Sequence, residues 1–315
     1  MPNGLVSMQS RDKNIYSVID IGTNTCLLLT AILNDNILTK LYEAQEIPRL
    51  GKDLYKTGMI SSESFQKVSE IFNRYISVSK EYGSERIFAF GTSAMRDAKN
   101  STEFIDFIEK STGIRIRIIT GKEEAKYSYE GAVFDMDKNK SYAVLDIGGG
   151  STEICFKERD EVSSVSFDIG AVRLFEQSLK KDLNTEDTES IKISIRRKIN
   201  SKDVNIGKRS LVGVAGTITT LSAIRNGLKD FDENIIHKDI LRISDINDIF
   251  NKLTSMTAQE RLDLGSYMAG RSDVIISGTL ILMELMKFLK AEEIIVSAKG
   301  LRYGLFLNIS DFNNS

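Results

Sequence analysis

The chain has 315 residues, of which 41% are hydrophobic and 27% charged, with a formal net charge of −2. This length is enough for a large buried core divided between about two domains. The nearly balanced charge argues against a general nucleic-acid or membrane-surface binder, so any anionic substrate must be held by a local site. No apolar run reaches the ~20 residues of a membrane helix. Because the first residues also lack a secretory signal, we expect a cytoplasmic protein.

The side chains on which many hydrolases depend are scarce. Cys26 and Cys155 lie in strand-like apolar runs, with no CxxC pair and no arginine six positions on. This excludes a cysteine-phosphatase loop and indicates buried free thiols. His237 is the only histidine, it has no partner motif around it, and no GxxxxGK[ST] loop occurs. Catalysis is therefore expected to rest on carboxylates.

Two segments of the chain repeat the same order of parts. Residues 16–33 and 142–156 each contain an apolar run, then Asp-Ile-Gly, then small or hydroxyl residues, then a second apolar run. Each predicts a β-hairpin with a tight turn that exposes backbone N–H groups, in which Asp20 or Asp146 ends the first strand. The repeat predicts two related halves whose phosphate-binding turns face each other across a cleft.

Strands and helices alternate after each hairpin, which predicts an α/β fold with a largely parallel sheet in each half. In the first half we expect helices over 63–81 and 101–111 and strands over 86–90 and 114–120. In the second half we expect helices over 172–179, 191–199, 217–225 and 272–289, a further element over 244–253, and strands over 210–216 and 293–298. The short polar segment 135–140 predicts domains at 1–136 and 137–315.

The turn between Asp146 and Glu153 carries the strongest chemical signal. Gly148, Gly149 and Gly150 let the backbone approach a phosphate, and Ser151 and Thr152 add hydroxyl donors. Asp146 and Glu153 frame this turn and can approach one ion, and such oxygen ligands suit Mg²⁺ or Mn²⁺. The alternative for Asp146 is a turn-capping carboxylate bonded to backbone amides.

The first turn is poorer in glycine but richer in side-chain donors. Thr23, Asn24 and Thr25 are candidates to bind phosphate oxygens together with the N–H groups of their turn. Such a hairpin alone would be unremarkable. Its pairing with the second turn makes it a candidate site.

Two further candidates follow predicted strands. Glu123 and Glu124 begin a helix, where acidic pairs ordinarily complement the helix dipole, but one could instead take a proton from water. Arg96 is a candidate phosphate clamp, the alternative being a surface salt bridge with Asp97 or Asp106. The basic run at 196–198 predicts a solvated helix face or a polyanion track.

These segments resemble the exopolyphosphatase and guanosine pentaphosphate phosphohydrolase family (Ppx/GppA) over about 15–309. The resemblance rests on seven ordered motifs: DIGTNT at 20–25, RLG at 49–51, TSAMRDA at 92–98, GKEEA at 121–125, DIGGGSTE at 146–153, GVAGT at 213–217 and SAKGLRYG at 297–304. It implies two duplicated actin-like (ribonuclease H-like) domains with an active-site cleft between them. It also implies a C-terminal helix, about 301–315, that packs back on the first domain.

The resemblance implies an exopolyphosphatase that releases the terminal phosphate of inorganic polyphosphate. Glu124 would be the general base, and Asp146 and Glu153 would hold Mg²⁺, with Mn²⁺ as an alternative. The phosphate-binding residues would be Thr23, Asn24, Thr25, Arg96, Gly148, Gly149, Gly150, Ser151 and Thr152. No nucleic-acid or membrane partner is implied, and a homodimer is left open.

Three other functions stay open. The substrate could be guanosine pentaphosphate (pppGpp), or the chain could be a sensor that binds guanosine penta- or tetraphosphate without hydrolysing it. The twin turns also fit an ATP-dependent phosphotransferase, although Glu124 and the TSAMRDA segment match the hydrolases. Lys299 stands where relatives are expected to carry a small or aromatic residue.

Overall fold

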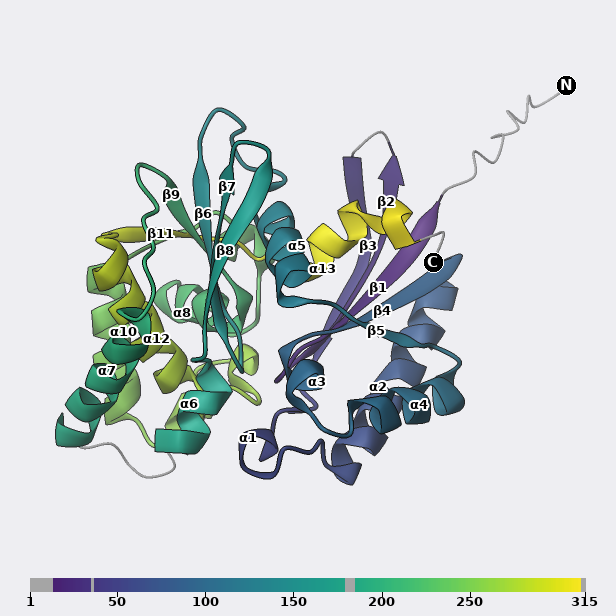
Figure 1. The fold of residues 1–315 in the computed structure, drawn as a ribbon, viewed down its shortest axis with the longest axis horizontal. Helices are drawn as coiled ribbons and strands as arrows, with labels where there is room; N and C mark the ends of the chain where they lie inside the picture. The colour runs from purple at the N-terminus through teal and green to yellow at the C-terminus, as the bar shows by residue number, and fades with distance from the viewer. Residues whose placement is uncertain (1–13, 35–36, 179–184, 313–315) are drawn as a thin grey trace, which may run out of the picture.

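The computed structural model describes residues 14–34, 37–178 and 185–312, and it contains two β-sheets lying side by side, each with its own helices (Figure 1). The first sheet has the order β3-β2-β1-β4-β5 and the second has the order β10-β11-β9-β6-β7-β8. The α/β architecture with two related halves is as expected. The described segments include no helix whose length and apolar character would let it cross a bilayer.

The first sheet begins with an antiparallel meander. It consists of β1 (Ile15–Ile21), β2 (Cys26–Asn34) and β3 (Ile37–Glu46), and β4 (Arg86–Gly91) and β5 (Ile116–Ile118) then continue parallel to β1. One face is covered by α2 (Ser62–Glu81) and α4 (Ser101–Thr112), whose Phe72 and Phe104 pack into a core with Ile19 and Leu28. The short helices α1 (Leu54–Thr57) and α3 (Ser93–Asp97) lie beyond the carboxyl ends of the strands.

The second sheet repeats this plan. Its strands are β6 (Tyr142–Ile147), β7 (Thr152–Glu158), β8 (Glu161–Phe167), β9 (Ser210–Val214), β10 (Ile240–Arg242) and β11 (Glu293–Val296). Its main helices are α6 (Ala171–Ser178), α7 (Thr185–Ile199), α8 (Ala215–Arg225), α10 (Ile243–Ser255) and α12 (Ile275–Leu289), and α9 (Glu233–Ile236) and α11 (Ala258–Leu262) are short. The largest core cluster lies here and includes Leu145, Ile154, Leu221 and Leu285.

Two helices lie between the sheets (Figure 1). Helix α5 (Gly121–Val133) packs on the second sheet, and α13 (Leu301–Leu307) packs on the first, where Tyr303 and Phe306 join a cluster with Val18 and Phe90. The two helices touch so closely that a Cβ on Gly304 would lie 1.8 Å from the backbone oxygen of Tyr127. The boundary expected at 136 follows α5 and stays a prediction.

The structure confirms the predicted helices over 63–81 and 101–111 and the strand over 86–90 within one or two residues. The expectation of a largely parallel sheet is wrong, because β3 and β8 extend each hairpin into an antiparallel meander. Other elements are shorter than predicted: β5 covers only 116–118, β9 ends at Val214 and α12 begins at Ile275. Residues 179 and 313–315 of two expected helices lie outside the described residues.

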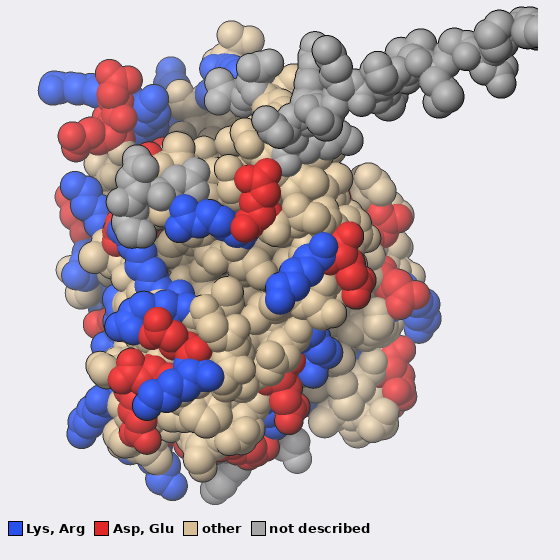
Figure 2. All heavy atoms as spheres, turned by 90° about the vertical axis from the view of Figure 1, so that its right-hand side faces the viewer, with Lys and Arg blue, Asp and Glu red and all other residues tan. Residues whose placement is uncertain are grey.

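The face of the first half carries both signs of charge. Figure 2 shows lysine and arginine side chains interspersed with aspartate and glutamate over this face. This face therefore shows no large area of a single charge sign. Ion pairs of the first half include Arg115 with Glu109 and Lys67 with Glu63.

Candidate active site

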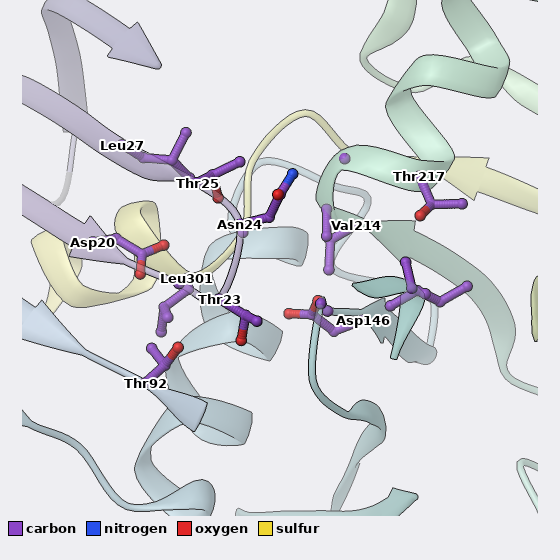
Figure 3. A pocket seen from close by; sticks show the side chains of 18 of the residues that line it. Asp20, Thr23, Asn24, Thr25, Leu27, Thr92, Asp146, Val214, Thr217 and Leu301 are labelled. Atoms are coloured by element: carbon purple, nitrogen blue, oxygen red, sulfur yellow. The ribbon is translucent and has the colours of Figure 1, made fainter. Parts of the chain in front are cut away.

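The two repeated turns line one cavity between the sheets (Figure 3). Turn 22–25 joins β1 to β2 and turn 148–151 joins β6 to β7, and each is closed by a backbone hydrogen bond, from Gly22 N to Thr25 O at 2.9 Å and from Gly148 N to Ser151 O at 3.0 Å. Ten of the predicted site residues line this cavity: Thr23, Asn24, Thr25, Glu124, Asp146, Gly148, Gly149, Gly150, Ser151 and Glu153. In Figure 3, the Thr23 side chain lies opposite that of Asp146.

The glycines of the second turn are required by close approach from the first half. A Cβ on Gly149 would lie 2.8 Å from Cβ of Thr23, and a Cβ on Gly150 would lie 2.1 Å from Oη of Tyr55. Such distances exclude a side chain unless the facing half moves. The turn is therefore built from glycine because Thr23 and Tyr55 pack directly on it.

Asp146 and Glu153 are cross-strand neighbours. They occupy opposite positions in the antiparallel pair β6–β7, which places their side chains on the same face of the sheet. Each carboxylate accepts a serine hydrogen bond: Ser128 Oγ lies 2.6 Å from Asp146 Oδ2, and Ser166 Oγ lies 2.8 Å from Glu153 Oε1. Burial raises the pKa of both carboxyl groups, in the case of Glu153 to about 8, with the charges of Glu124 and Asp146 adding to the effect.

The structure separates the roles of Glu123 and Glu124. Glu123 closes a capping box at the start of α5, since its carboxylate accepts from Thr120 N at 2.8 Å while Thr120 Oγ1 accepts from Glu123 N at 3.2 Å. Glu124 instead lines the cavity, and its Oε2 lies 2.7 Å from Nη1 of Arg96. Burial raises the pKa of Glu124, and Arg96 opposes this shift. Glu123 is therefore used by the helix cap, and Glu124 is the residue of the pair that lines the cavity.

Two predicted phosphate ligands are not brought to the cavity wall. Thr152 is fully buried in β7, and its hydroxyl donates to the backbone oxygen of Ile169 at 2.6 Å. Arg96 contacts Glu124 and donates to Ile119 O at 2.9 Å, rather than pairing with Asp97 or Asp106. Arg96 therefore reaches the site through Glu124.

Asp20 was predicted only to end its strand, but it also lines the cavity. Asp20 is 7% exposed, and its Oδ1 has no hydrogen-bond partner among the described residues. Burial, with the charge of Glu124 adding to it, raises the pKa of Asp20 to about 7. Asp20, Glu124, Asp146 and Glu153 thus form a buried acidic group that a bound cation would stabilise. No three metal-ligating side chains converge on one point within the described residues.

Three cationic side chains line the cavity, and none was predicted as a phosphate ligand. Lys299 pairs with Asp135 and Arg302 pairs with Glu43. Arg271 is 7% exposed and donates to Gln45 Oε1 at 2.8 Å, and burial lowers its pKa to about 10. In the described part of the chain no carboxylate forms an ion pair with Arg271. No local motif marks Arg271, because its environment comes from β3 and α8.

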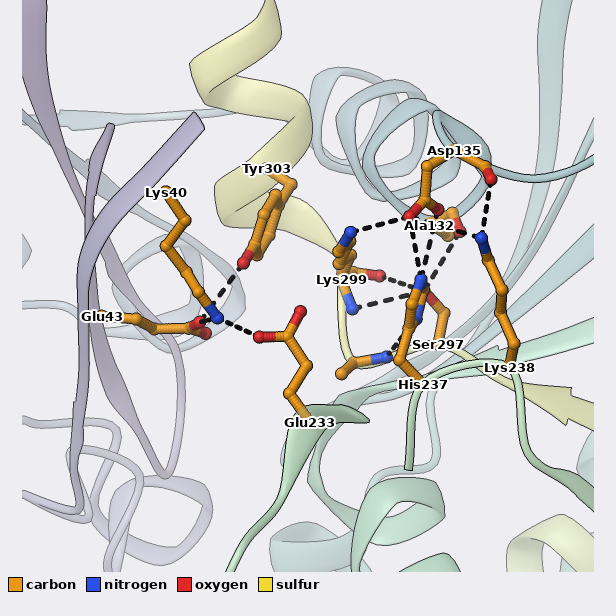
Figure 4. Close-up of polar contacts among 11 residues, drawn as sticks. Lys40, Glu43, Ala132, Asp135, Glu233, His237, Lys238, Ser297, Lys299 and Tyr303 are labelled. Carbon is orange, nitrogen blue, oxygen red and sulfur yellow. Dashed lines mark hydrogen bonds and ion pairs between the residues drawn. The ribbon is translucent and has the colours of Figure 1, made fainter. Parts of the chain in front are cut away.

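A second polar cluster joins the halves beside the cavity (Figure 4). Asp135 accepts from His237 Nε2 at 3.1 Å and from Lys299 Nζ at 2.7 Å, while His237 Nδ1 accepts from Ala298 N at 3.3 Å. Lys40 of β3 pairs with Glu233 of α9. His237 is therefore held by hydrogen bonds to Asp135 and Ala298, and the ammonium group of Lys299 forms an ion pair with Asp135.

The basic run at 196–198 lies at the end of α7 with Arg196 and Arg197 exposed, as predicted for a solvated helix face. Arg196 donates to both carboxylate oxygens of Glu284 at 2.6 and 3.2 Å, and the Glu284 side chain is only 2% exposed. Lys198 donates to Asp168 O at 3.0 Å. Arg196 thus ties α7 to α12.

Comparison with known proteins identifies the family to which this architecture belongs. The family model described as Ppx/GppA phosphatase family matches residues 31–311. The chain belongs to the Ppx/GppA phosphatase family. The match includes Glu124, turn 148–151 and α13, and it begins within β2, so Asp20 and turn 22–25 of the cavity lie before it.

Individual members of the Ppx/GppA family are similar over nearly the whole chain. Exopolyphosphatase 2 of Mycobacterium tuberculosis is 30% identical over 93% of this chain and 98% of its own length. A bifunctional 3-dehydroquinate synthase/phosphatase of Fusobacterium nucleatum is 34% identical over 96% of this chain, which spans about half (48%) of that protein. The crystal structure of an exopolyphosphatase-like protein superposes with a TM-score of 0.89 at 27% identity, covering 97% of this chain and 100% of that one.

Proposed function

We propose that this protein is an exopolyphosphatase that hydrolyses the terminal phosphoanhydride of inorganic polyphosphate, releasing orthophosphate and a chain one phosphate shorter. The observation that carries the proposal is the convergence of Glu124, Asp146 and Glu153 on a cavity bounded by two hairpin turns. Similarity to exopolyphosphatase 2 over nearly the full length of both chains supports it. We also propose that the protein acts in the cytoplasm.

Glu124 is proposed as the general base. It stands at the start of α5 inside the cavity, where a carboxylate can take a proton from water as the water attacks phosphorus. Burial favours its neutral form, and the ion pair with Arg96 favours the ionised form that a base requires. Arg96 is thus proposed to keep the base charged.

The terminal phosphates are proposed to lie against the two turns. The backbone N–H groups of Gly149 and Gly150, together with the Thr23 and Ser151 side chains, offer donors to phosphate oxygens. The buried charge of Arg271 is proposed to contact a phosphate farther from the cleaved bond. An anion there would supply the ionic partner that the described structure does not.

Asp146 and Glu153 are proposed to hold Mg²⁺ or Mn²⁺. Both side chains are hard oxygen donors on one face of a β-ladder, and burial raises the pKa of both carboxyl groups, an effect that a bound cation would oppose. When bound, the ion would offset negative charge on the transferring phosphoryl group. The two serine hydroxyls would orient the carboxylates toward it.

A second candidate substrate is pppGpp, and Phe231 is the observation that favours it. Phe231 lines the cavity while 49% exposed, an unusual position for a large aromatic side chain. Two of the three cations in the cavity are already paired with acids, which leaves little free positive charge for a long polyanion. An aromatic ring could instead stack on a nucleobase. Binding of the same ligand without hydrolysis would make the protein a sensor.

The test is phosphate release from long-chain polyphosphate, pppGpp and ATP, each incubated with purified protein and Mg²⁺. Release from polyphosphate that Glu124→Gln abolishes would support the exopolyphosphatase assignment. Phosphate release from pppGpp alone would support the second function. Loss of that release in Phe231→Ala would support a contact between the Phe231 ring and the guanine base. Tight binding of pppGpp without release would indicate a sensor, and phosphorylation of a sugar from ATP would indicate a phosphotransferase.

A further inference from the structure

We infer that Ser128 is a positioning residue that fixes the helix of Glu124 against the strand of Asp146. The inference rests on the proposed function, since it concerns the proposed base and a proposed metal ligand. Ser128 Oγ lies 2.6 Å from Asp146 Oδ2, and the serine is 1% exposed. The buried hydroxyl therefore forms its hydrogen bond with this carboxylate and not with water. Hydrogen bonds to charged groups are among the stronger ones in proteins.

The position of Ser128 on α5 links its hydrogen bond to Glu124. Glu124 and Ser128 are four residues apart, so they lie on the same face of the helix about one turn from each other. A bond that holds Ser128 to Asp146 also holds Glu124 at a set height and rotation above β6. Both Glu124 and Asp146 line the cavity, so this contact sets the separation of two groups that must act on one phosphate.

Helix α13 also packs tightly on α5 at Tyr127 and Gly131, but Ser128 supplies a side-chain hydrogen bond from α5 to β6. Ala125, Tyr129 and Ala132 pack on the second sheet with Val144 and Val212 through apolar surface, which tolerates small shifts. Farther along, Ser297 Oγ donates to Ala132 O at 3.0 Å. That bond lies about one turn beyond Ser128. The start of α5 is held by the Thr120–Glu123 cap and by ion pairs of Glu123 with Arg117 and of Glu124 with Arg96, and Ser128 adds the bond to β6.

Ser166 provides a matched comparison within the same chain. Its hydroxyl donates to Glu153 Oε1 at 2.8 Å, so it supports the other proposed metal ligand in the same way. Ser166 lies on β8, and no proposed base shares its strand. If Ser128 acted only by orienting a metal ligand, removing either hydroxyl would have the same consequences.

The experiment compares Ser128→Ala, Ser128→Cys and Ser166→Ala with the wild-type protein. It measures the Mn²⁺ dissociation constant by electron paramagnetic resonance, kcat and KM at saturating Mn²⁺, and hydrogen exchange of the amides at 121–128. We expect both alanine variants to bind Mn²⁺ about tenfold more weakly, in the range found for residues behind metal ligands. In Ser128→Ala alone, kcat should stay about tenfold or more below wild type at saturating Mn²⁺ with KM little changed, and exchange at 121–128 should be faster. Ser128→Cys, a weaker donor of similar size, should be intermediate.

Equal behaviour of the two alanine variants, with kcat restored by Mn²⁺ and exchange at 121–128 unchanged, would overturn the inference. If the wild-type protein hydrolysed none of the substrates, the proposed function would fail, but the exchange comparison would still decide whether Ser128 fixes α5. Slower folding, or loss of hydrogen-exchange protection throughout Ser128→Ala, would count against a local role of Ser128. Ser128→Cys would then be compared with Ser166→Ala in place of the alanine variant.

Discussion

Oε2 of Glu124 lies 2.7 Å from Nη1 of Arg96, so the arginine that was expected to bind phosphate forms an ion pair with the expected general base. The two residues come from α3 and α5, of which only α5 was predicted, and they meet at the carboxyl ends of β4 and β5. The pair accounts for how a carboxylate that is buried beside Asp146 can stay ionised. It also makes the charge state of Glu124 dependent on Arg96.

Arg96→Met should therefore move the acid limb of the pH–kcat profile toward higher pH. Burial already raises the pKa of Glu124, and loss of the opposing arginine raises it further. A general base works only when it is ionised. As pH is lowered, kcat of Arg96→Met should therefore begin to fall at a higher pH than kcat of the wild-type protein. The measurement is kcat between pH 5 and 9 for both proteins.

Arg115→Met is the matched control for this profile. Arg115 is an exposed arginine that pairs with Glu109 on the surface, so its loss should leave the acid limb in place. Coincident profiles for wild type and Arg96→Met would contradict the proposed role of the Arg96–Glu124 pair.

Arg271→Met should weaken substrate binding without lowering stability. A charge-assisted contact to phosphate is worth about 1.5–3 kcal/mol, which corresponds to a rise in KM of about tenfold to a hundredfold. The free protein should keep or gain thermal stability, because the variant removes a buried charge that has no ionic partner in the described structure. A lowered melting temperature with unchanged KM would assign Arg271 a structural role instead.

Gly150→Ala should cost about 1–3 kcal/mol of unfolding free energy, because overpacking forces its neighbours to move. The added Cβ would lie 2.1 Å from Tyr55 Oη and 2.5 Å from Ser93 Oγ. Gly121→Ala is the control, since a Cβ there meets nothing within 4 Å, and a helical alanine is neutral or stabilising by up to about 1 kcal/mol. Chemical denaturation of both variants checks this, and an unchanged stability of Gly150→Ala would mean that turn 148–151 is not packed against Tyr55 and Ser93 in solution.

Asp135→Asn should reduce stability at pH 7 by about 1–3 kcal/mol, the range for hydrogen bonds to charged groups. Burial alone would raise the pKa of Asp135, but hydrogen bonds from His237 and Lys299 outweigh it and hold the pKa well below its usual range. The stabilisation is therefore present above the unfolded pKa of about 4 and is lost as pH falls below it. The difference in unfolding free energy between the wild-type protein and Asp135→Asn should become smaller at acid pH. Asp160→Asn, at a fully exposed position, is the control and should change the unfolding free energy little.

Much of the site was predictable because it follows from local repetition. The Asp-Ile-Gly repeat predicted two hairpins, and the hairpin register then places Asp146 opposite Glu153 without further information. The choice between Glu123 and Glu124 could also have been predicted, since Thr120 and Glu123 have the spacing of a capping box, which leaves Glu124 as the carboxylate that the cap does not use.

The missed features depend on contacts between distant segments. Arg271 meets Gln45 across 226 positions, and Arg302 reaches Glu43 from the other end of the chain. Strand β3 escaped prediction because it is partly exposed along most of its length and carries charges within its apolar pattern. Thr152 follows Ser151 directly, but the strand alternation turns its hydroxyl away from the cavity toward Ile169.

The central claim is that Glu124 is the base of a terminal phosphate hydrolase, and steady-state phosphate release by Glu124→Gln tests it most directly. The amide keeps the shape of the side chain but cannot take a proton, so kcat on the preferred substrate should fall by about a hundredfold or more with KM changed little. Glu123→Gln, which alters the neighbouring cap, should keep most of the activity. Near wild-type turnover in Glu124→Gln would contradict the account.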